Sequence, residues 1–202
     1  MGLGRRFAMV VAGTLSLALA APAMAQFSDS FTFLKAVRDR DGGKAQPLLD
    51  KPGAPVLNTR DPSTGETALH IVTKGHDMTW LSFLLGRGAS TEIKDRNGMT
   101  PLMVAAQTGD ADAARLLMSA GANVNAVDTV GETALIFAVH NRDLATARLL
   151  IANGANPDIR DTIAGKSARD YATEDRRGDT MLKVLQEAKP TKPKGPVAGP
   201  VR

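Results

Sequence analysis

Residues 95–127 read DRNGMTPLMVAAQTGDADAARLLMSAGANVNAV, and this segment contains the signals of two short helices and a turn. Thr100 suits the N-cap of a helix and Pro101 suits its first position. The aliphatic residues that follow form an apolar stripe on that helix, and Gly109 ends it. A second apolar helix leads to Gly121, since glycine readily adopts the left-handed conformation that often follows a helix. The segment therefore predicts a helix–turn–helix unit followed by an extended turn.

The same landmarks recur on both sides of this unit at a fixed spacing. Gly-Ala pairs begin at positions 88, 121 and 154, which are 33 residues apart, and aspartates stand at 61, 95, 128 and 161. A third landmark, Thr-Ala-Leu or Thr-Pro-Leu, begins at positions 67, 100 and 133. One such unit cannot bury its apolar face by itself, whereas stacked neighbours can. The period therefore predicts an elongated stack of repeats.

The repeated units resemble ankyrin repeats. The resemblance is nearly complete in 95–127, close in 128–160, and includes one extra residue in the finger turn of 61–94. Residues 161–188 depart more, with Arg169 in place of a core leucine, as a polar C-terminal capping repeat would. The resemblance implies an all-α ankyrin-repeat solenoid, in which helix–turn–helix repeats are joined by β-hairpin-like finger turns.

Two flanking segments follow other patterns. Residues 26–60 keep part of the repeat and are interpreted as a degenerate N-terminal capping repeat, in which Phe31 and Phe33 would cover the open end of the core. Residues 189–202 contain four prolines, two glycines and no acidic residue. Such a composition cannot form a packed element, so this segment is expected to be a disordered tail.

The first 25 residues have the features of a secretory signal peptide. Arg5 and Arg6 form a basic start, positions 7–21 are an uncharged, mostly apolar run of 15 residues, and Ala23-Met24-Ala25 matches a signal-peptidase site. A membrane anchor is the alternative, but a helix needs roughly 18–20 apolar residues to cross a bilayer. The sequence therefore predicts cleavage after Ala25, no transmembrane segment afterwards, and a location in the bacterial periplasm, with release beyond it as the alternative.

Composition excludes several classes of protein. The 202 residues contain no cysteine, which excludes a disulfide framework and thiolate catalysis. The net charge of +4 suggests a nucleic-acid binder at first. The excess, however, lies in the leader and the tail, because residues 26–188 hold 19 basic and 21 acidic residues. A nucleic-acid partner is therefore not expected.

The sequence offers few groups for catalysis. None of the histidines, His70, His76 and His140, has the spacing of a metal site. The ankyrin resemblance implies that His70 hydrogen-bonds a finger turn, while His76 is expected in solvent and His140 on the inner groove, where it could bind a partner. The repeated aspartates recur once per unit, which indicates a folding role. We therefore expect no enzyme, no cofactor and no metal.

The resemblance also indicates where a partner would bind. Ankyrin repeats usually bind other proteins through the finger tips and the face of the inner helices, and Trp80 is a further candidate anchor that is more readily explained by packing between repeats. The positions of this chain that match the family's binding surface are Glu66, Lys74, Arg87, Lys94, Arg96, Asn97, Met99, Gln107, Thr108, Thr129, Val130, Glu132, His140, Asn141 and Asn153.

Two functions from different classes remain. The first is a non-catalytic, monomeric, exported scaffold that binds an unidentified protein in the periplasm. The second is a tether that holds the chain to an anionic membrane or cell-wall polymer through the cations of the tail, which are Lys189, Lys192, Lys194 and Arg202.

Overall fold

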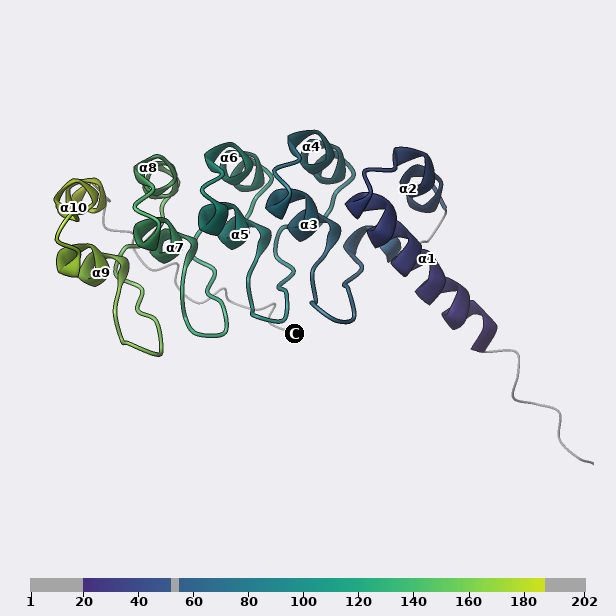
Figure 1. Cartoon of the computed structure of the whole chain (residues 1–202), viewed down its shortest axis with the longest axis horizontal. Coiled ribbons are helices and arrows are strands. Elements are labelled where there is room, and N and C mark those ends of the chain that lie inside the picture. Colours follow the sequence, from purple (N-terminus) through teal and green to yellow (C-terminus); the bar gives the residue numbers. More distant parts are fainter. Residues whose placement is uncertain (1–19, 52–54, 188–202) are drawn as a thin grey trace, which may run out of the picture.

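The computed structural model describes residues 20–51 and 55–187. The basic tail and most of the predicted leader lie outside these residues. Within them the chain forms ten α-helices and one short 3-10 helix, and its only β-structure is a pair of isolated antiparallel bridges, Val127 with Thr133 and Arg160 with Ser167. The helices stack side by side as pairs, and the all-α repeat solenoid predicted from the sequence is confirmed (Figure 1).

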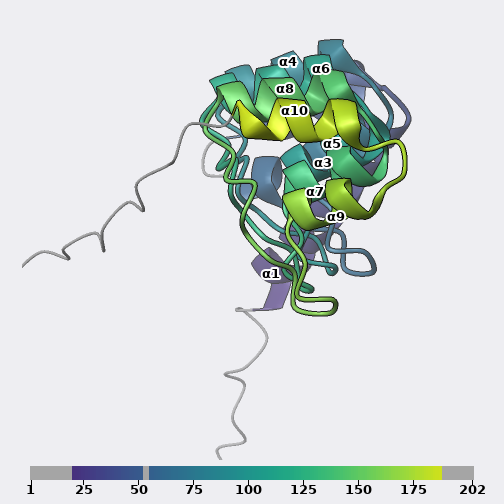
Figure 2. The same ribbon diagram turned by 90° about the vertical axis from the view of Figure 1, so that its left-hand side faces the viewer.

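Each pair contains one helix from each of two layers. Figure 1 shows α3, α5, α7 and α9 in the inner layer, next to the finger turns, and α4, α6, α8 and α10 in the outer layer. Figure 2, turned by 90°, shows the two layers almost end on, with the fingers extending below the inner one. The bounds are α1 Ala20–Arg38, α2 Gly42–Leu49, η1 Pro55–Asn58, α3 Ala68–Lys74, α4 Met78–Gly86, α5 Pro101–Thr108, α6 Ala111–Ser119, α7 Ala134–His140, α8 Leu144–Ala152, α9 Ala168–Glu174 and α10 Asp179–Gln186.

The helices begin where capping side chains stand. The hydroxyl of Thr100 accepts a hydrogen bond from the Met103 amide at 3.4 Å, and Pro101 follows it, as the sequence predicts. Asp110 caps the outer helix α6 in the same way, accepting from the Ala113 amide at 2.9 Å. Such caps satisfy main-chain donors that a helix cannot satisfy internally, so each helix can be short.

The core is aliphatic and runs through the whole stack. Leu117 of α6 and Leu150 of α8 are fully buried between neighbouring pairs. Phe33 of α1 is also fully buried, but Phe31 is 62% exposed. Two residues along a helix point to nearly opposite sides, so only one of the two phenylalanines can face the core. The prediction that Phe31 covers the core is therefore wrong.

The two ends of the stack differ from its middle. The pair α1–α2 packs against the first full repeat, and α1 continues through the predicted cleavage site after Ala25. At the other end Arg169 does not fill the core, because its guanidinium bonds Asp158 at 2.8 Å.

Among the described residues, no helix combines the length and apolar character that crossing a bilayer requires.

Candidate protein-binding surface

The finger turns are built around the repeated aspartates. One carboxylate oxygen of Asp128 accepts hydrogen bonds from the amides of Val130 and Glu132, both at 2.9 Å. In the last finger, Asp161 accepts from the amides of Ile163 at 2.9 Å and Ala164 at 2.6 Å. These aspartates fold the turns, as predicted.

Neighbouring fingers are joined to one another by main-chain hydrogen bonds. The amide of Thr129 donates to the Asn97 carbonyl at 3.0 Å, and the amide of Thr162 donates to the Val130 carbonyl at 2.8 Å. The joint needs glycine, because a β-carbon at Gly98 (φ +79°) would lie 2.6 Å from the Thr129 nitrogen. The fingers therefore form one continuous row rather than independent loops.

His70 links the first full repeat to the second. Its Nδ1 accepts from the Thr67 amide at 3.1 Å, so its Nε2 is the protonated nitrogen and donates to the Met99 carbonyl at 2.9 Å. Burial lowers the pKa of His70, since the charged imidazolium is poorly solvated there. His70 is therefore a neutral structural residue, which confirms the role that the ankyrin resemblance implies.

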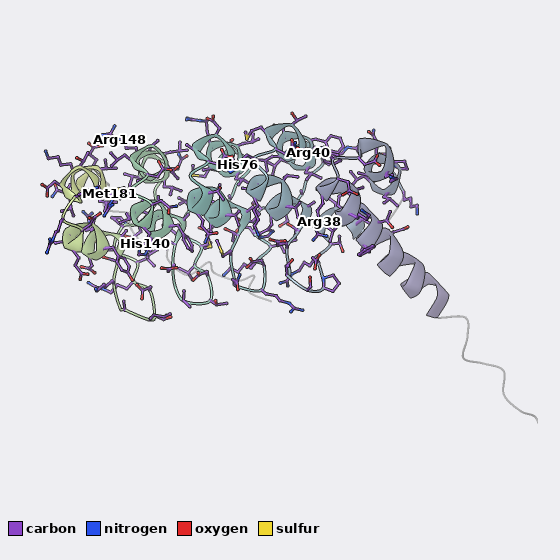
Figure 3. The ribbon with its side chains drawn as sticks, viewed as in Figure 1. Arg38, Arg40, His76, His140, Arg148 and Met181 are labelled. Carbon is purple, nitrogen blue, oxygen red and sulfur yellow. The ribbon has the colours of Figure 1, made fainter. Side chains whose placement is uncertain are left out.

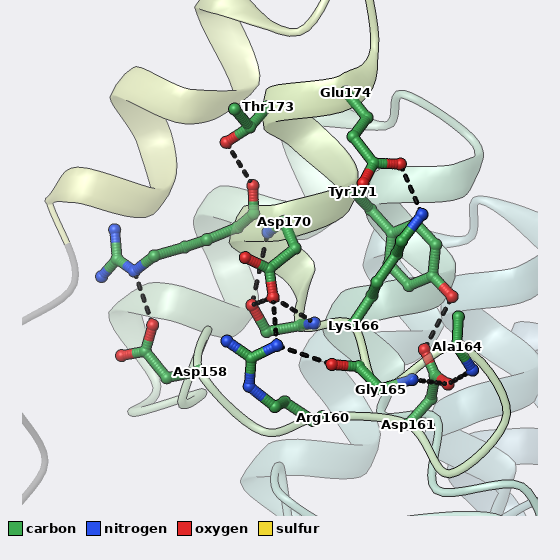
Figure 4. Close-up of polar contacts among 12 residues, drawn as sticks. Asp158, Arg160, Asp161, Ala164, Gly165, Lys166, Asp170, Tyr171, Thr173 and Glu174 are labelled. Carbon is green, nitrogen blue, oxygen red and sulfur yellow. Dashed lines mark hydrogen bonds and ion pairs between the residues drawn. The ribbon is translucent and has the colours of Figure 1, made fainter.

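Contacts between polar or charged side chains connect the base of a finger to the end of the inner helix in the same repeat. Glu66 meets Lys74 at 3.3 Å, and Glu132 meets His140 at 3.4 Å. In the last repeat the signs are reversed, with Lys166 and Glu174 at 2.6 Å (Figure 4). We call these three pairs the inner-face pairs. Four of the predicted binding residues therefore contact one another in two pairs.

The second full repeat has no such pair. Its corresponding residues are Met99 and Gln107; Gln107 is exposed, but Met99 is only 7% exposed. The prediction of Met99 as a surface residue is wrong, because it packs into the core beside the turn that His70 holds. The middle of the inner face is therefore uncharged at these two positions.

Two other predicted residues lie away from the inner face. Arg87 and Asn153 are the C-caps of the outer helices α4 and α8. Arg87 bonds Asp50 at 2.8 Å and lies over the ring of Phe83 at 5.1 Å. The prediction that these two residues lie on the finger tips or the inner-helix face is wrong. They end outer helices and therefore lie in the outer layer.

Several of the remaining candidates hold neighbouring repeats together. Lys94 donates to the Val127 carbonyl at 2.6 Å, and the guanidinium of Arg96 donates to the Pro62 carbonyl. The side chain of Asn141 donates to the Gln107 carbonyl at 2.7 Å.

The hydroxyls of two further candidates also bond main-chain carbonyls. Thr108 donates to Val104 and Thr129 donates to Asn97. Val130 is half-buried. Asn97 and Gln107 are thus the exposed candidates with the greatest freedom to meet a partner.

Sequence reasoning missed a cluster around Tyr171, the only tyrosine of the chain. Its ring lies 4.5 Å from that of His140 between centroids, and its hydroxyl donates to Asp161 at 2.6 Å (Figure 4). This hydrogen bond raises the pKa of Tyr171 to about 12, because ionisation would break it beside a carboxylate. Burial raises the pKa of Glu132, which also contacts His140. A lone tyrosine in the divergent last repeat was the available signal.

A second set of contacts lies at the turns between inner and outer helices. Arg40 meets Asp77 at 2.8 Å, and Arg142 meets Asp175 at 2.5 Å. His76, predicted to lie in solvent, is exposed but also bonds Asp110 of the next repeat at 2.8 Å. Figure 3 labels Arg40 and His76 beside these turns. Arg40 and His76 thereby bond the aspartate that caps the outer helix of the next repeat, and Arg142 bonds the aspartate that ends α9.

Trp80 of the outer helix α4 is half-buried and faces α2. Its ring meets that of Phe83 edge-on, with centroids 5.6 Å apart. Together with Arg40 and Gln46 these rings line a surface hollow of about 300 Å³. Trp80 therefore packs between repeats, as expected.

In the part of the chain that the structure describes, no three metal-binding side chains come together.

Comparison with known proteins agrees with this architecture. The family model for ankyrin repeats (3 copies) matches residues 33–128 and 81–161. Oxysterol-binding protein homolog 1 of Saccharomyces cerevisiae is 34% identical over 83 residues, which are 40% of this chain and 7% of the yeast protein. The chain thus spans only a small part of that relative's length. Ankyrin repeats generally mediate protein–protein interaction and are generally non-catalytic. Since the family matches extend over more than half of the chain, it belongs to the ankyrin-repeat family.

Proposed function

We propose that this chain is a non-catalytic scaffold that binds a protein partner through its finger row and inner-helix face. The observation that carries this proposal is the continuous row of fingers, joined by main-chain hydrogen bonds, with exposed side chains such as Asn97 beside it. The groups that could perform chemistry are used otherwise: His70 and the finger aspartates hold the fold. A rigid surface with little internal freedom loses little entropy on binding.

We further propose that the scaffold acts in the bacterial periplasm after export. Its support is the basic start, the 15-residue apolar run and the Ala23-Met24-Ala25 site of the sequence. The absence of cysteine is compatible with an oxidising compartment, because the stack is closed by packing and needs no disulfide. N-terminal sequencing of the protein recovered from periplasmic extract tests this location, and an intact N-terminus in the cytoplasmic fraction would refute it.

The binding experiment is affinity capture of a partner from periplasmic extract, with matched charge reversals. Lys74→Glu changes the inner face, and Arg148→Glu makes the same change on the outer layer, at the opposite side from His140 (Figure 3). Both residues are exposed, so neither change should cost more than about 1 kcal/mol of stability. We expect Lys74→Glu to weaken capture and Arg148→Glu to leave it unchanged; the reverse result would place the binding surface elsewhere.

The alternative function is a tether that binds anionic surfaces through the four cations of residues 189–202. The observation that favours it is their concentration in 14 residues without an acidic partner. Removing residues 189–202 and measuring sedimentation with envelopes at low salt tests it. Unchanged sedimentation would exclude the tether and leave the scaffold untouched.

A further inference from the structure

The last finger has no neighbour among the described residues, although it keeps the surface that the other fingers use for a neighbour. In each joint the acceptor is the residue before the finger glycine: Thr64, Asn97 and Val130 accept from the next finger at 3.0, 3.0 and 2.8 Å. The corresponding residue of the last finger is Ala164. Within the described residues no main-chain donor meets the Ala164 carbonyl.

The surroundings of the finger glycines show the same difference between the last finger and the others. A β-carbon at Gly98 or Gly131 would lie 2.6 or 3.0 Å from the nitrogen of the following finger. At Gly165, whose φ is also positive (+66°), a β-carbon would meet nothing within 4 Å. Next to it Ile163 is 78% exposed, the largest exposure of any large apolar side chain in the described residues. We call Ile163, Ala164 and Gly165 the open finger edge; it stands at the left-hand end of the row in Figure 1.

The helices at this end are closed in the usual manner. The outward positions of α10, among them Thr180 and Lys183, are polar and exposed, so the helical core ends in a solvated face. Among the described residues, the finger row ends in a main-chain acceptor without a donor, beside an apolar side chain. Exposed apolar groups next to unpaired main-chain groups are typical of surfaces that bind another chain.

Arg96 is the donor in the first joint, and the two other joints indicate a donor of a second kind that would fit there. Thr129 and Thr162 each donate twice to the preceding finger, through the amide and through the hydroxyl; the hydroxyl distances are 2.8 and 2.9 Å. A second copy of this chain cannot supply such a donor from its first finger, because the corresponding residue is Pro62, which has no amide hydrogen. The amides of its other fingers are already used in its own joints.

We propose that the open finger edge binds a threonine- or serine-bearing turn of another protein, whose amide and hydroxyl both donate to the Ala164 carbonyl while an apolar residue covers Ile163. The edge continues the finger–finger interface, so the partner takes the place of one more finger. This inference rests on the proposed protein-binding function and specifies one part of the surface that carries it.

The test uses the full chain and a head-to-tail cyclic peptide that contains residues 127–133, VDTVGET, as the probe. Amide chemical shifts of Ala164 and Gly165 should move saturably on titration with this peptide. The same peptide with proline in place of its first threonine has no amide donor there, and it should leave both shifts unchanged. Equal responses to the two peptides, or no response to either, would overturn the proposal.

A matched pair of variants separates the edge from general effects on folding. Gly165→Asn places a side chain in the open space next to Gly165, and asparagine tolerates the positive φ. Gly121→Asn makes the same change at another open glycine (φ +92°) that follows the outer helix α6. We expect Gly165→Asn to weaken peptide binding at least tenfold and Gly121→Asn to leave it unchanged.

The captured partner provides the final discrimination. A partner whose capture is weakened by Lys74→Glu but not by Gly165→Asn would overturn the open-edge proposal and leave the proposed function standing. If the cyclic peptide binds but periplasmic extract yields no captured protein, the edge proposal is supported and the proposed periplasmic function fails.

Discussion

Asp143 caps α8 with one carboxylate oxygen, while its other oxygen faces Gly109 of the preceding repeat and finds no hydrogen-bond partner among the described residues. In the neighbouring repeats Arg40, His76 and Arg142 stand at the position of Gly109, and each bonds an aspartate of the next repeat, which is Asp77, Asp110 or Asp175 respectively. The stack therefore lacks one of four equivalent contacts between repeats.

Filling that position should stabilise the stack. Gly109→Arg places a donor beside Asp143, and arginine already adopts a positive φ at Arg40 and Arg142. Gly109→Ala carries the same backbone strain without the donor, so it is the matched control. We expect the arginine variant to exceed the alanine variant in free energy of unfolding by about 1–2 kcal/mol, measured in urea. Equal stabilities would mean that Asp143 is satisfied by solvent.

Truncating the shared core tests the register of the repeats. Leu117→Ala and Leu150→Ala remove side chains that are fully buried between neighbouring pairs. Each should lower the free energy of unfolding by about 2–5 kcal/mol, through lost burial and the cavity left behind. Arg148→Ala on the exposed face of α8 serves as the control and should change stability by less than about 0.5 kcal/mol. Costs near zero at both leucines would contradict the alignment of the repeats.

His70 should make the stack less stable in mild acid. Its pKa is lowered from 6.5 by burial, so in the folded state it binds a proton less readily than in the unfolded chain. The stability that neutral His70 contributes to the folded state is therefore fully present above pH 6.5. It is lost as the pH falls from 6.5 through the lower pKa of the folded state. Unfolding curves of the wild type and of His70→Gln between these limits provide the measurement. The wild type should lose more stability with falling pH than the variant, and parallel curves would refute the assignment.

The single tyrosine allows a direct titration. The pKa of Tyr171 is raised to about 12, chiefly because its hydroxyl donates to Asp161. Ultraviolet absorbance of the tyrosinate should therefore show little ionisation at the ordinary tyrosine pKa of about 10. Asp161→Asn should lower the midpoint, whereas Glu187→Gln, which removes the carboxylate at the C-cap of α10, should not. A midpoint near 10 in the wild type would show that the hydrogen bond is absent in solution.

The repeated landmarks were enough to predict the fold, because stacking imposes the same packing on every unit. The helix start at Thr100 and the folding role of the aspartates follow from that repetition and are confirmed. The structural role of His70, which the ankyrin resemblance implies, is confirmed as well. Predictions of surface residues were wrong where exposed and buried positions lie close together in the chain. Met99 precedes an inner helix and points into the core, although its neighbour Asn97 is exposed.

Contacts between repeats were harder to predict from the sequence. The pairs Arg40–Asp77 and Arg142–Asp175 join residues more than 30 positions apart, and their partners depend on how the units are rotated against each other. The same holds for His140, which was predicted as a candidate, whereas its neighbour Tyr171 was not. A periodic pattern indicates which residues are equivalent, but not which of them touch across a joint.

The finger glycines also bear on how freely the sequence can drift. Gly98 and Gly131 are fixed twice, by a positive φ and by the backbone that lies against them, whereas Gly165 is fixed only by its φ. A substitution of Gly98 or Gly131 must displace the neighbouring finger, but a substitution of Gly165 disturbs its own turn alone. Adaptation to a new partner by single mutations is therefore easiest at the final finger, and the interior of the row should change slowly over evolutionary time.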